Sequence, residues 1–298
     1  KFSIQNTTKQ NLWLQLADGS TSTYLDFYVP DSLNTYHEPI LLGALRPQEN
    51  KLLNSNYYCV PIAKANDKQV RTYYLRIESI MPKNHTFKVG TFTALDQELK
   101  LSDYAVAAYV AVILAMLIYN LFIFFSIKER VYLAYISYLV YILVMIPFTS
   151  GYPLFYASWM WKYIFVWSSL GYIASTVFAT MYLSIPKKCP KFYTWLLFLT
   201  VVMSLVFPLL NLFEIVDVVT IFASNQFFSF VYTISLLGVA IYLWVKGQKN
   251  ARFYVLAWAS VFIVIFTYIF TAVGIFPVTK MTPYINYIGF TLDDFILR

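Results

Sequence analysis

Charged residues are scarce in this chain, and their scarcity excludes most water-soluble folds. Asp, Glu, Lys and Arg make up 12% of the 298 residues, whereas soluble domains contain about one quarter. Hydrophobic residues make up 59%, and the mean hydropathy is +0.59. A chain of this length cannot hide so much apolar surface in a water-soluble core. The composition therefore predicts an integral membrane protein.

Cysteine and histidine are almost absent, which argues against several kinds of site. The two cysteines, Cys59 and Cys189, are too few for a disulfide framework. His37 lies beside Glu38 and near Asp31, but scattered loop residues of this kind do not make a metal site. The sequence contains no Gly-rich phosphate loop, nucleophile elbow or zincin motif. We therefore expect no catalytic residue, no metal and no cofactor within this chain.

The first hundred residues show a strand pattern. Leu12, Leu14 and Leu16 alternate with polar or aromatic neighbours, and the alternation recurs over residues 24–29 and 73–78. A period of two predicts strands that bury one face. Turn-forming residues separate these runs, and short strands at such spacing favour an all-β sandwich or jelly roll.

Long apolar runs begin at Tyr104, and a run of about 20 residues is needed to cross a bilayer. Six runs follow each other: Tyr104–Ile127, Val131–Thr149, Tyr163–Leu183, Trp195–Leu212, Val218–Val245 and Ala251–Val273. A seventh run, Tyr284–Arg298, is shorter and is either a truncated helix or not a span. The sequence thus predicts an all-β domain at residues 1–100 followed by an all-α, seven-helix transmembrane bundle at residues 104–298.

Basic residues between the runs predict the orientation. Eight lie in the loops after the first, third and fifth runs, whereas Lys162 and Lys280 are the two in the other loops. Because cytoplasmic loops are enriched in Lys and Arg, the β domain is expected outside the membrane and the C-terminus inside. Cys59 and Cys189 then lie on opposite sides and cannot pair. An exported domain needs a signal peptide, which we expect before Lys1. The net charge of +7 is explained by topology, and no nucleic-acid partner is expected.

Polar residues within the apolar runs are candidates for function, because burying them in a membrane is costly. Asn120 lies near the inner end of the first run and is expected to form an interhelical hydrogen bond. Asn225 and Gln226 lie in the outer half of the fifth run, where they either line an outward-facing cavity or hold helices together. Asp293 is expected to couple the seventh helix to the bundle, unless its segment has already reached water.

Five strand residues are candidates for a ligand surface, namely Trp13, Tyr24, Tyr28, Tyr74 and Arg76. Aromatic faces stack on the apolar faces of sugars, and arginine donates hydrogen bonds. The alternative is that these aromatics pack against a second sheet. If they are exposed, they predict a small-molecule or carbohydrate-like ligand.

Several motifs of this chain resemble those of one family of membrane proteins. The first cytoplasmic junction of that family is similar to Tyr119-Asn120-Leu121-Phe122, Lys128-Glu129-Arg130 and Tyr132-Leu133-Ala134-Tyr135. Its periplasmic jelly-roll domain is similar to Phe2-Ser3-Ile4-Gln5-Asn6, Leu12-Trp13-Leu14-Gln15-Leu16, Asp26-Phe27-Tyr28-Val29 and Tyr73-Tyr74-Leu75-Arg76-Ile77-Glu78-Ser79. Gly289 with Leu292-Asp293 resembles its seventh helix, although Asp stands where Glu is usual. These motifs together resemble the bacterial seven-transmembrane receptors with diverse intracellular signalling modules, and the resemblance covers almost the whole chain.

The resemblance implies a signalling receptor of the bacterial inner membrane, in which a ligand bound outside acts through seven helices on a cytoplasmic output domain beyond Arg298. The lipid bilayer is then one partner, and a second copy of the chain is another candidate. The alternative is a small-solute transporter or channel with an extracytoplasmic accessory domain, and a third interpretation is a scaffold for an envelope complex. Residues after Arg298 would distinguish these. A retinal protein is excluded because the seventh run lacks lysine.

Overall fold

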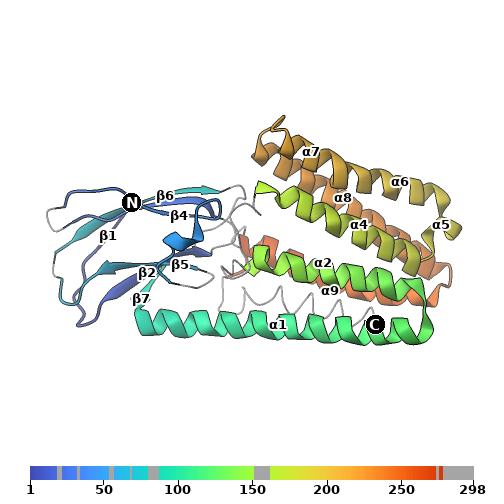
Figure 1. The fold of residues 1–298 in the computed structure, drawn as a ribbon, viewed down its shortest axis with the longest axis horizontal. Helices are drawn as coiled ribbons and strands as arrows, with labels where there is room; N and C mark the ends of the chain where they lie inside the picture. The colour runs from blue at the N-terminus through green and yellow to red at the C-terminus, as the bar shows by residue number, and fades with distance from the viewer. Residues whose placement is uncertain are drawn as a thin grey trace. The chain divides into compact units, whose positions relative to one another are not determined.

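The computed structural model describes residues 1–18, 22–31, 34–53, 57–67, 69–79, 87–150, 162–272 and 275–277. The chain forms two compact units. One contains the strands, the first turns of the first long helix up to Tyr104 and the end of the second long helix from Ile146. The other contains the remaining helical residues. Figure 1 shows the strands and helices of both units.

Two antiparallel sheets form the β unit, as the alternation predicted. The strands are β1 (Phe2–Ile4), β2 (Leu12–Asp18), β3 (Ser22–Tyr28), β4 (Ile40–Leu42), β5 (Tyr57–Ala63), β6 (Arg71–Ser79) and β7 (Lys88–Thr91), with a short 3-10 helix, η1 (Gln48–Asn50), after β4. One sheet has the order β1-β6-β3-β4 and the other β5-β2-β7. Every pairing among the described strands is antiparallel, including those between strands distant in sequence, such as β1 with β6.

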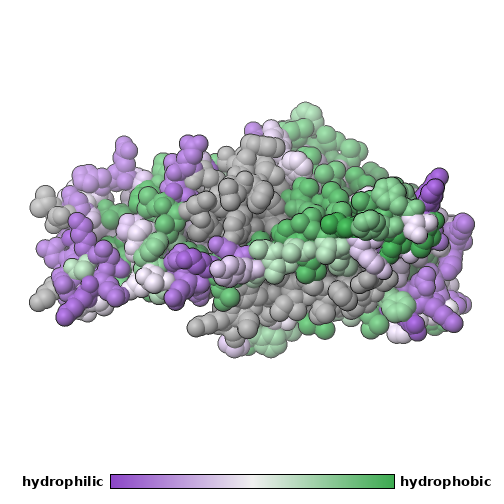
Figure 2. Space-filling view, turned by 60° about the horizontal axis from the view of Figure 1, so that its bottom comes forward, coloured by the Kyte–Doolittle hydropathy of each residue, from purple (hydrophilic) through white to green (hydrophobic). Residues whose placement is uncertain are grey.

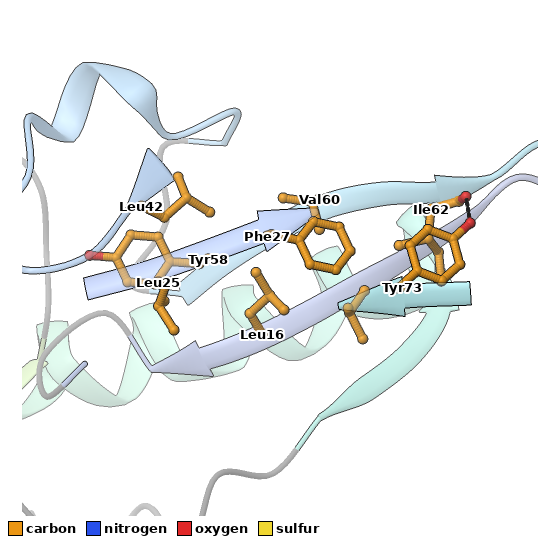
Figure 3. Close-up of a cluster of buried hydrophobic side chains, with 9 residues drawn as sticks. Leu16, Leu25, Phe27, Leu42, Tyr58, Val60, Ile62 and Tyr73 are labelled. Carbon is orange, nitrogen blue, oxygen red and sulfur yellow. Dashed lines mark hydrogen bonds between the residues drawn. The ribbon is translucent and has the colours of Figure 1, made fainter. Parts of the chain in front are cut away.

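The core of the sandwich draws side chains from both sheets (Figure 3). Leu14 and Leu16 come from β2, and Leu25 and Phe27 come from β3. Each of these side chains is at most 1% exposed. Burying a side chain of this size contributes about 1.5–3 kcal/mol. Tyr73 of β6 stacks on Phe27 and donates its hydroxyl hydrogen bond to the Ile62 carbonyl on β5, so that one residue joins the two sheets. The alternating leucines of the sequence are therefore the residues that bring the sheets together.

The helical unit follows the predicted order of apolar runs. Its elements are α1 (Phe92–Ile127), α2 (Arg130–Ser150), α4 (Ile164–Tyr182), α5 (Ile185–Lys188), α6 (Pro190–Val201), the π-helical η3 (Val202–Val206), α7 (Phe207–Leu212), α8 (Val218–Val245) and α9 (Lys249–Ala272). Four described segments are long and apolar enough to cross a membrane, namely α1, α4, α6 through α7, and α8. Figure 2 shows hydrophobic residues gathered over the helices. The seventh run, Tyr284–Arg298, lies outside the described residues.

Helix α1 begins earlier than its apolar run. It starts at Phe92, inside the segment predicted to belong to the β domain, because the Thr91 hydroxyl caps it by accepting a hydrogen bond from the Ala94 N–H at 3.3 Å. Its first turns carry polar residues, which the hydropathy pattern could not assign to a span. Its buried residues recur every three or four positions and are Leu95, Leu99, Ser102, Val106, Tyr109, Ile113, Met116 and Asn120. Such a stripe is one helix face, and bilayer lipid is expected to cover the exposed apolar remainder.

Two local features shape the packing of the other helices. Gly171 of α4 faces Tyr141 of α2 so closely that an added Cβ would lie 2.1 Å from the Tyr141 Cζ atom. The π-helical turn η3 lies just before Pro208, which is buried in α7. Proline lacks an N–H and crowds the carbonyl of the preceding turn, so a widened turn relieves the conflict within a continuous helical segment.

Candidate functional site

One face of the β1-β6-β3-β4 sheet brings four predicted ligand residues together. Because Leu25 and Phe27 point into the core, Tyr24, Tyr28 and their neighbours of the same parity point away from it. The strand register places Tyr28 opposite Tyr74, and Asp26 opposite Arg76. We call the surface formed by Tyr24, Asp26, Tyr28, Tyr74 and Arg76 the outer face.

Exposure on the outer face is graded. Tyr74 is 41% exposed and the Arg76 side chain 69%, whereas Tyr24 and Tyr28 are half-buried. The Tyr36 ring meets the Tyr74 ring edge-on at 5.3 Å, and the Lys1 ammonium lies 5.7 Å from the centre of the Tyr74 ring. An exposed aromatic ring beside an exposed guanidinium can stack on one side of a ligand and donate hydrogen bonds to its edge.

A buried carboxylate organises the charges of this face. Asp26 lies 2.6 Å from the Arg46 guanidinium and 3.6 Å from that of Arg76. Arg46 also lies over the Tyr24 ring, 5.3 Å from its centre. The sequence did not single out Arg46, because it lies in the turn after β4 and no strand pattern marks it. Glu78 is 3.5 Å from Arg76, so two carboxylates balance two guanidinium groups.

The turn that delivers Arg46 depends on a glycine. Gly43 has a φ of +134°, and a Cβ there would lie 2.4 Å from the Thr23 carbonyl oxygen. The next residue, Ala44, donates a backbone hydrogen bond of 2.8 Å to the Ser22 carbonyl. Only a residue without a side chain allows this approach, which brings the turn against β3 and Arg46 to Asp26.

Trp13 does not belong to the outer face. It lies on β2, which pairs with β5 and β7 in the other sheet. The Trp13 ring packs against Phe92 at the start of α1, with 5.3 Å between ring centres. Period-two alternation gives the face of each strand but not the sheet that contains it, so the sequence grouped Trp13 with residues of a different surface.

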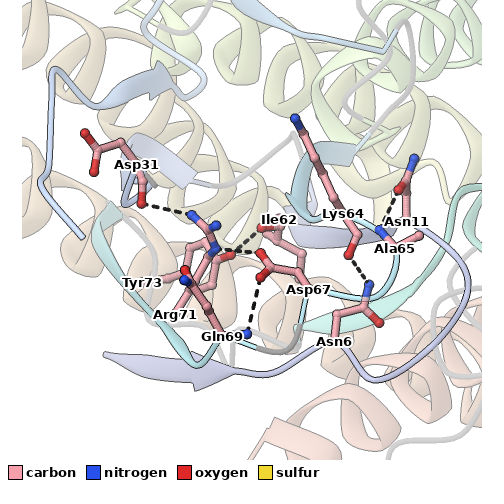
Figure 4. Close-up of polar contacts among 10 residues, drawn as sticks. All are labelled: Asn6, Asn11, Asp31, Ile62, Lys64, Ala65, Asp67, Gln69, Arg71 and Tyr73. Atoms are coloured by element: carbon pink, nitrogen blue, oxygen red, sulfur yellow. Dashed lines mark hydrogen bonds and ion pairs between the residues drawn. The ribbon is translucent and has the colours of Figure 1, made fainter. Parts of the chain in front are cut away.

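The polar residues near the His37 loop form structural contacts. His37 Nε2 lies 3.2 Å from Asp31, and within the described residues no cluster of metal-ligating side chains is found. Figure 4 shows the neighbouring contacts: Arg71 binds the Asp67 carboxylate at 2.7 Å and the Asp31 carbonyl at 2.9 Å. The hydrogen bond from Arg71 holds the pKa of Asp67 below its usual value. These contacts join the ends of strands.

A buried hydroxyl cluster links three membrane helices. Thr176 of α4 bonds Thr200 of α6 at 2.7 Å and the Tyr232 hydroxyl of α8 at 2.9 Å. Tyr232 also donates to Ser175 at 3.3 Å. Thr176, Thr200 and Tyr232 are each at least 90% buried. Hydroxyl residues are common in apolar runs, and no sequence signal distinguished these from the others.

Asn225 lies next to this cluster, whereas Gln226 does not share its environment. The Tyr172 side chain on α4 lies near the polar side chains of Asn225 and Ser229 on α8. Asn225 is buried and Gln226 is exposed. The Tyr172 ring meets the Tyr232 ring edge-on at 5.8 Å, so Asn225 extends the cluster along α4 and α8. This geometry favours a role for Asn225 in packing α4 against α8 over a cavity lined by both Asn225 and Gln226.

Asn120 is buried, but its hydrogen bond differs from the expectation. Its side-chain amide donates to the Met116 carbonyl of its own helix at 2.8 Å. An amide in an apolar stripe can satisfy itself on the preceding turn, a choice that the sequence does not reveal. Among the described residues, the observed bond is thus within α1 and not between helices. Asp293 lies outside the described residues, and its coupling role stays a prediction.

These features define a membrane protein with an N-terminal β sandwich and a bundle of apolar helices. Residues 102–298 match the family model described as 7TM diverse intracellular signalling. Residues 1–91 match the model described as 7TMR-DISM extracellular 2. The chain therefore belongs to the 7TMR-DISM family of seven-transmembrane signalling receptors, with an extracellular N-terminal domain. A search of curated proteins and a search of solved structures each found no match.

Proposed function

We propose that this receptor senses a neutral, carbohydrate-like ligand on the outer face of its β sandwich. The observation that carries the proposal is that Tyr74 and Arg76 are both exposed and lie two positions apart on β6, on the same face of the sheet. The tyrosine ring offers a stacking surface, and the guanidinium offers several hydrogen-bond donors.

The charge balance favours an uncharged ligand. Asp26 and Glu78 offset Arg46 and Arg76, and the Lys1 ammonium beside Tyr74 adds one positive charge, so the outer face presents donors and acceptors with little net charge. Polyhydroxylated molecules with an apolar ring face match this combination. A site for an anionic ligand would be expected to contain more basic residues without a counter-ion than this surface does.

Ligand binding is proposed to bias two arrangements of the helices, as two-state coupling requires. The buried cluster of Thr176, Thr200 and Tyr232 is the proposed switch element, since its hydroxyl groups can exchange partners without exposing a charge to lipid. Asp293 is proposed to relay the change through the seventh helix to a cytoplasmic output. The inner membrane of a bacterium is the proposed location, and pairing of two chains the proposed assembly.

The test is direct binding of soluble oligosaccharides to the whole chain in lipid nanodiscs. A glycan microarray identifies a binder, and calorimetry then measures its affinity. Tyr74→Ala and Arg76→Ala should each weaken binding about tenfold, as expected for contact residues near the centre of a site. Phe87→Ala is the matched control, because Phe87 is 46% exposed and precedes β7 of the other sheet.

Two results would overturn the proposal. If no oligosaccharide binds, the ligand belongs to another chemical class. If one binds but Tyr74→Ala and Phe87→Ala reduce its affinity equally or not at all, the site lies elsewhere. Tyr74→Phe should retain most of the affinity, because the stacking surface remains.

A further inference from the structure

An open groove of about 700 Å³ lies between the start of α6 and the last turns of α8. Lys188, Lys191 and Phe192 line one side, and Gly238, Val239 and Tyr242 line the other. About one helical turn after Lys191, the Trp195 indole N–H donates a hydrogen bond to the Ser235 hydroxyl at 3.3 Å and so joins α6 to α8. The groove lies wholly within the helical unit and is separate from both sites described above.

The rim of the groove carries positive charge. Lys188 and Lys191 are exposed, and among the described residues neither takes part in an ion pair. The Lys188 ammonium donates to the Gln248 side-chain oxygen at 2.6 Å, and Gln248 in turn donates to the Leu183 carbonyl. A neutral amide thus positions the lysine without neutralising it. The surrounding stretches 183–192 and 242–252 contain further bases and no Asp or Glu.

The floor of the groove is apolar and open toward lipid. A Cβ added at Gly238 would meet nothing within 4 Å, so the space at this exposed glycine is open. Tyr242 is 52% exposed, and Ile234 and Ile241 of the same helix are also exposed. Figure 2 shows hydrophobic residues over the bundle and hydrophilic residues at the end where α5 lies in Figure 1. The groove therefore joins a cationic rim to an apolar surface.

We infer that this groove binds one anionic phospholipid, with its phosphate at Lys188 and Lys191 and an acyl chain along α8 beside Gly238. Basic pockets between transmembrane helices are suited to anionic headgroups, and the apolar floor requires an acyl chain that a free phosphate lacks. The orientation proposed from the loop charges assigns the lipid to the cytoplasmic leaflet. The inference does not depend on the ligand of the sandwich.

The experiment is a lipid titration of the whole purified chain followed by native mass spectrometry, with phosphatidylglycerol and phosphatidylcholine as probes. Phosphatidylglycerol should bind at least fivefold more tightly. Replacing both lysines (Lys188→Gln with Lys191→Gln) should weaken that binding about 25-fold, or about fivefold for each cation. The matched control is Lys128→Gln with Lys249→Gln, which removes equal charge from connections that do not line the groove.

A second variant tests the apolar floor. Gly238→Leu should fill the groove and abolish the preference for phosphatidylglycerol without lowering the thermal midpoint, since the new side chain meets open space. Ala223→Leu adds the same bulk at an exposed position of α8 and should change nothing. Equal binding of the two lipids, equal losses in both lysine pairs, or unchanged binding in Gly238→Leu would each overturn the inference. Competition by glycerol 3-phosphate as strong as by the lipid would instead show a soluble-phosphate site and also overturn it.

Discussion

Asp26 and Arg46 meet at 2.6 Å with their side chains 8% and 19% exposed, so the turn after β4 supplies the counter-ion of a buried carboxylate on β3. Arg76 approaches the same carboxylate at 3.6 Å but is 69% exposed. The two arginines therefore have different tasks. Arg46 stabilises the sandwich, and Arg76 keeps a guanidinium in contact with solvent.

Removing Arg46 should destabilise the sandwich far more than removing Arg76. Arg46→Met leaves Asp26 buried with only a distant partner, which should cost roughly 3 kcal/mol. Arg76→Met breaks an exposed pair and should cost less than about 1 kcal/mol. Thermal unfolding of the two variants, followed by tyrosine and tryptophan absorbance, measures the difference. Equal losses would show that Arg46 is not the principal partner of Asp26.

The hydroxyl of Tyr232 should contribute measurably to the stability of the bundle. Tyr232→Phe removes its bonds to Thr176 and Ser175 while keeping the ring. Interhelical hydrogen bonds in membranes average about 0.6 kcal/mol and reach about 1.7 kcal/mol. Tyr242→Phe is the control, since Tyr242 is 52% exposed on the same helix. Detergent-unfolding curves should separate the two variants, and indistinguishable curves would remove Tyr232 from the proposed switch.

Gly171 and Gly238 should respond oppositely to the same substitution. Gly171→Ala forces its Cβ into the Tyr141 ring, and overpacking of this kind costs about 1–3 kcal/mol. Gly238→Ala meets open space and should gain up to about 1 kcal/mol from better helix propensity. The melting temperatures of the two variants provide the comparison. A Gly171→Ala protein as stable as the parent would mean that α2 and α4 separate easily.

Cys59 should resist alkylation up to unusually high pH. Burial raises the pKa of its thiol to about 11, and the neighbouring Lys51 ammonium opposes this shift. The folded state therefore favours the protonated thiol, a contribution that is present below the ordinary pKa of 9.0 and lost as the pH rises through 11. Iodoacetamide labelling followed by mass spectrometry should give a midpoint near pH 11. A midpoint at or below 9 would contradict the burial.

Surface labelling should show the β domain outside the cell. In a Cys59→Ser, Cys189→Ser background, a cysteine at Lys9 should react with an impermeant maleimide in intact spheroplasts. A cysteine at Lys187 should react only after permeabilisation, because its loop belongs to the basic, cytoplasmic set. Labelling of both, or the reverse pattern, would overturn the orientation derived from the loop charges.

Sequence periodicity predicted the strands and membrane helices because both depend on which residues meet water or lipid. The leucines at positions 12, 14 and 16 had to share a face, and they do. Which strands become neighbours depends on long-range pairing, so Trp13 was wrongly grouped with Tyr74. The start of α1 was also misplaced, since its first turns are amphipathic and lack the uniform hydropathy of a span.

The candidate sites were only partly accessible from sequence for a related reason. Asn120 and Asn225 stand out because amides are rare in apolar runs, although the bond made by Asn120 stays within its helix. Thr176 and Thr200 carry no such signal, because threonine can satisfy its hydroxyl on its own helix, as Thr200 also does at Leu196. Only the packing of α4 against α6 makes them a pair.

No residue separates the last strand of the sandwich from the first long helix, since β7 ends at Thr91 and α1 begins at Phe92. Trp13 packs on Phe92, Leu95 lies over Gly90, and Lys88 binds Glu98 at 2.6 Å. The junction between β7 and α1 is therefore held by contacts on successive turns of the helix, without a flexible linker. A displacement of β7 is therefore expected to move the first turns of α1 as well.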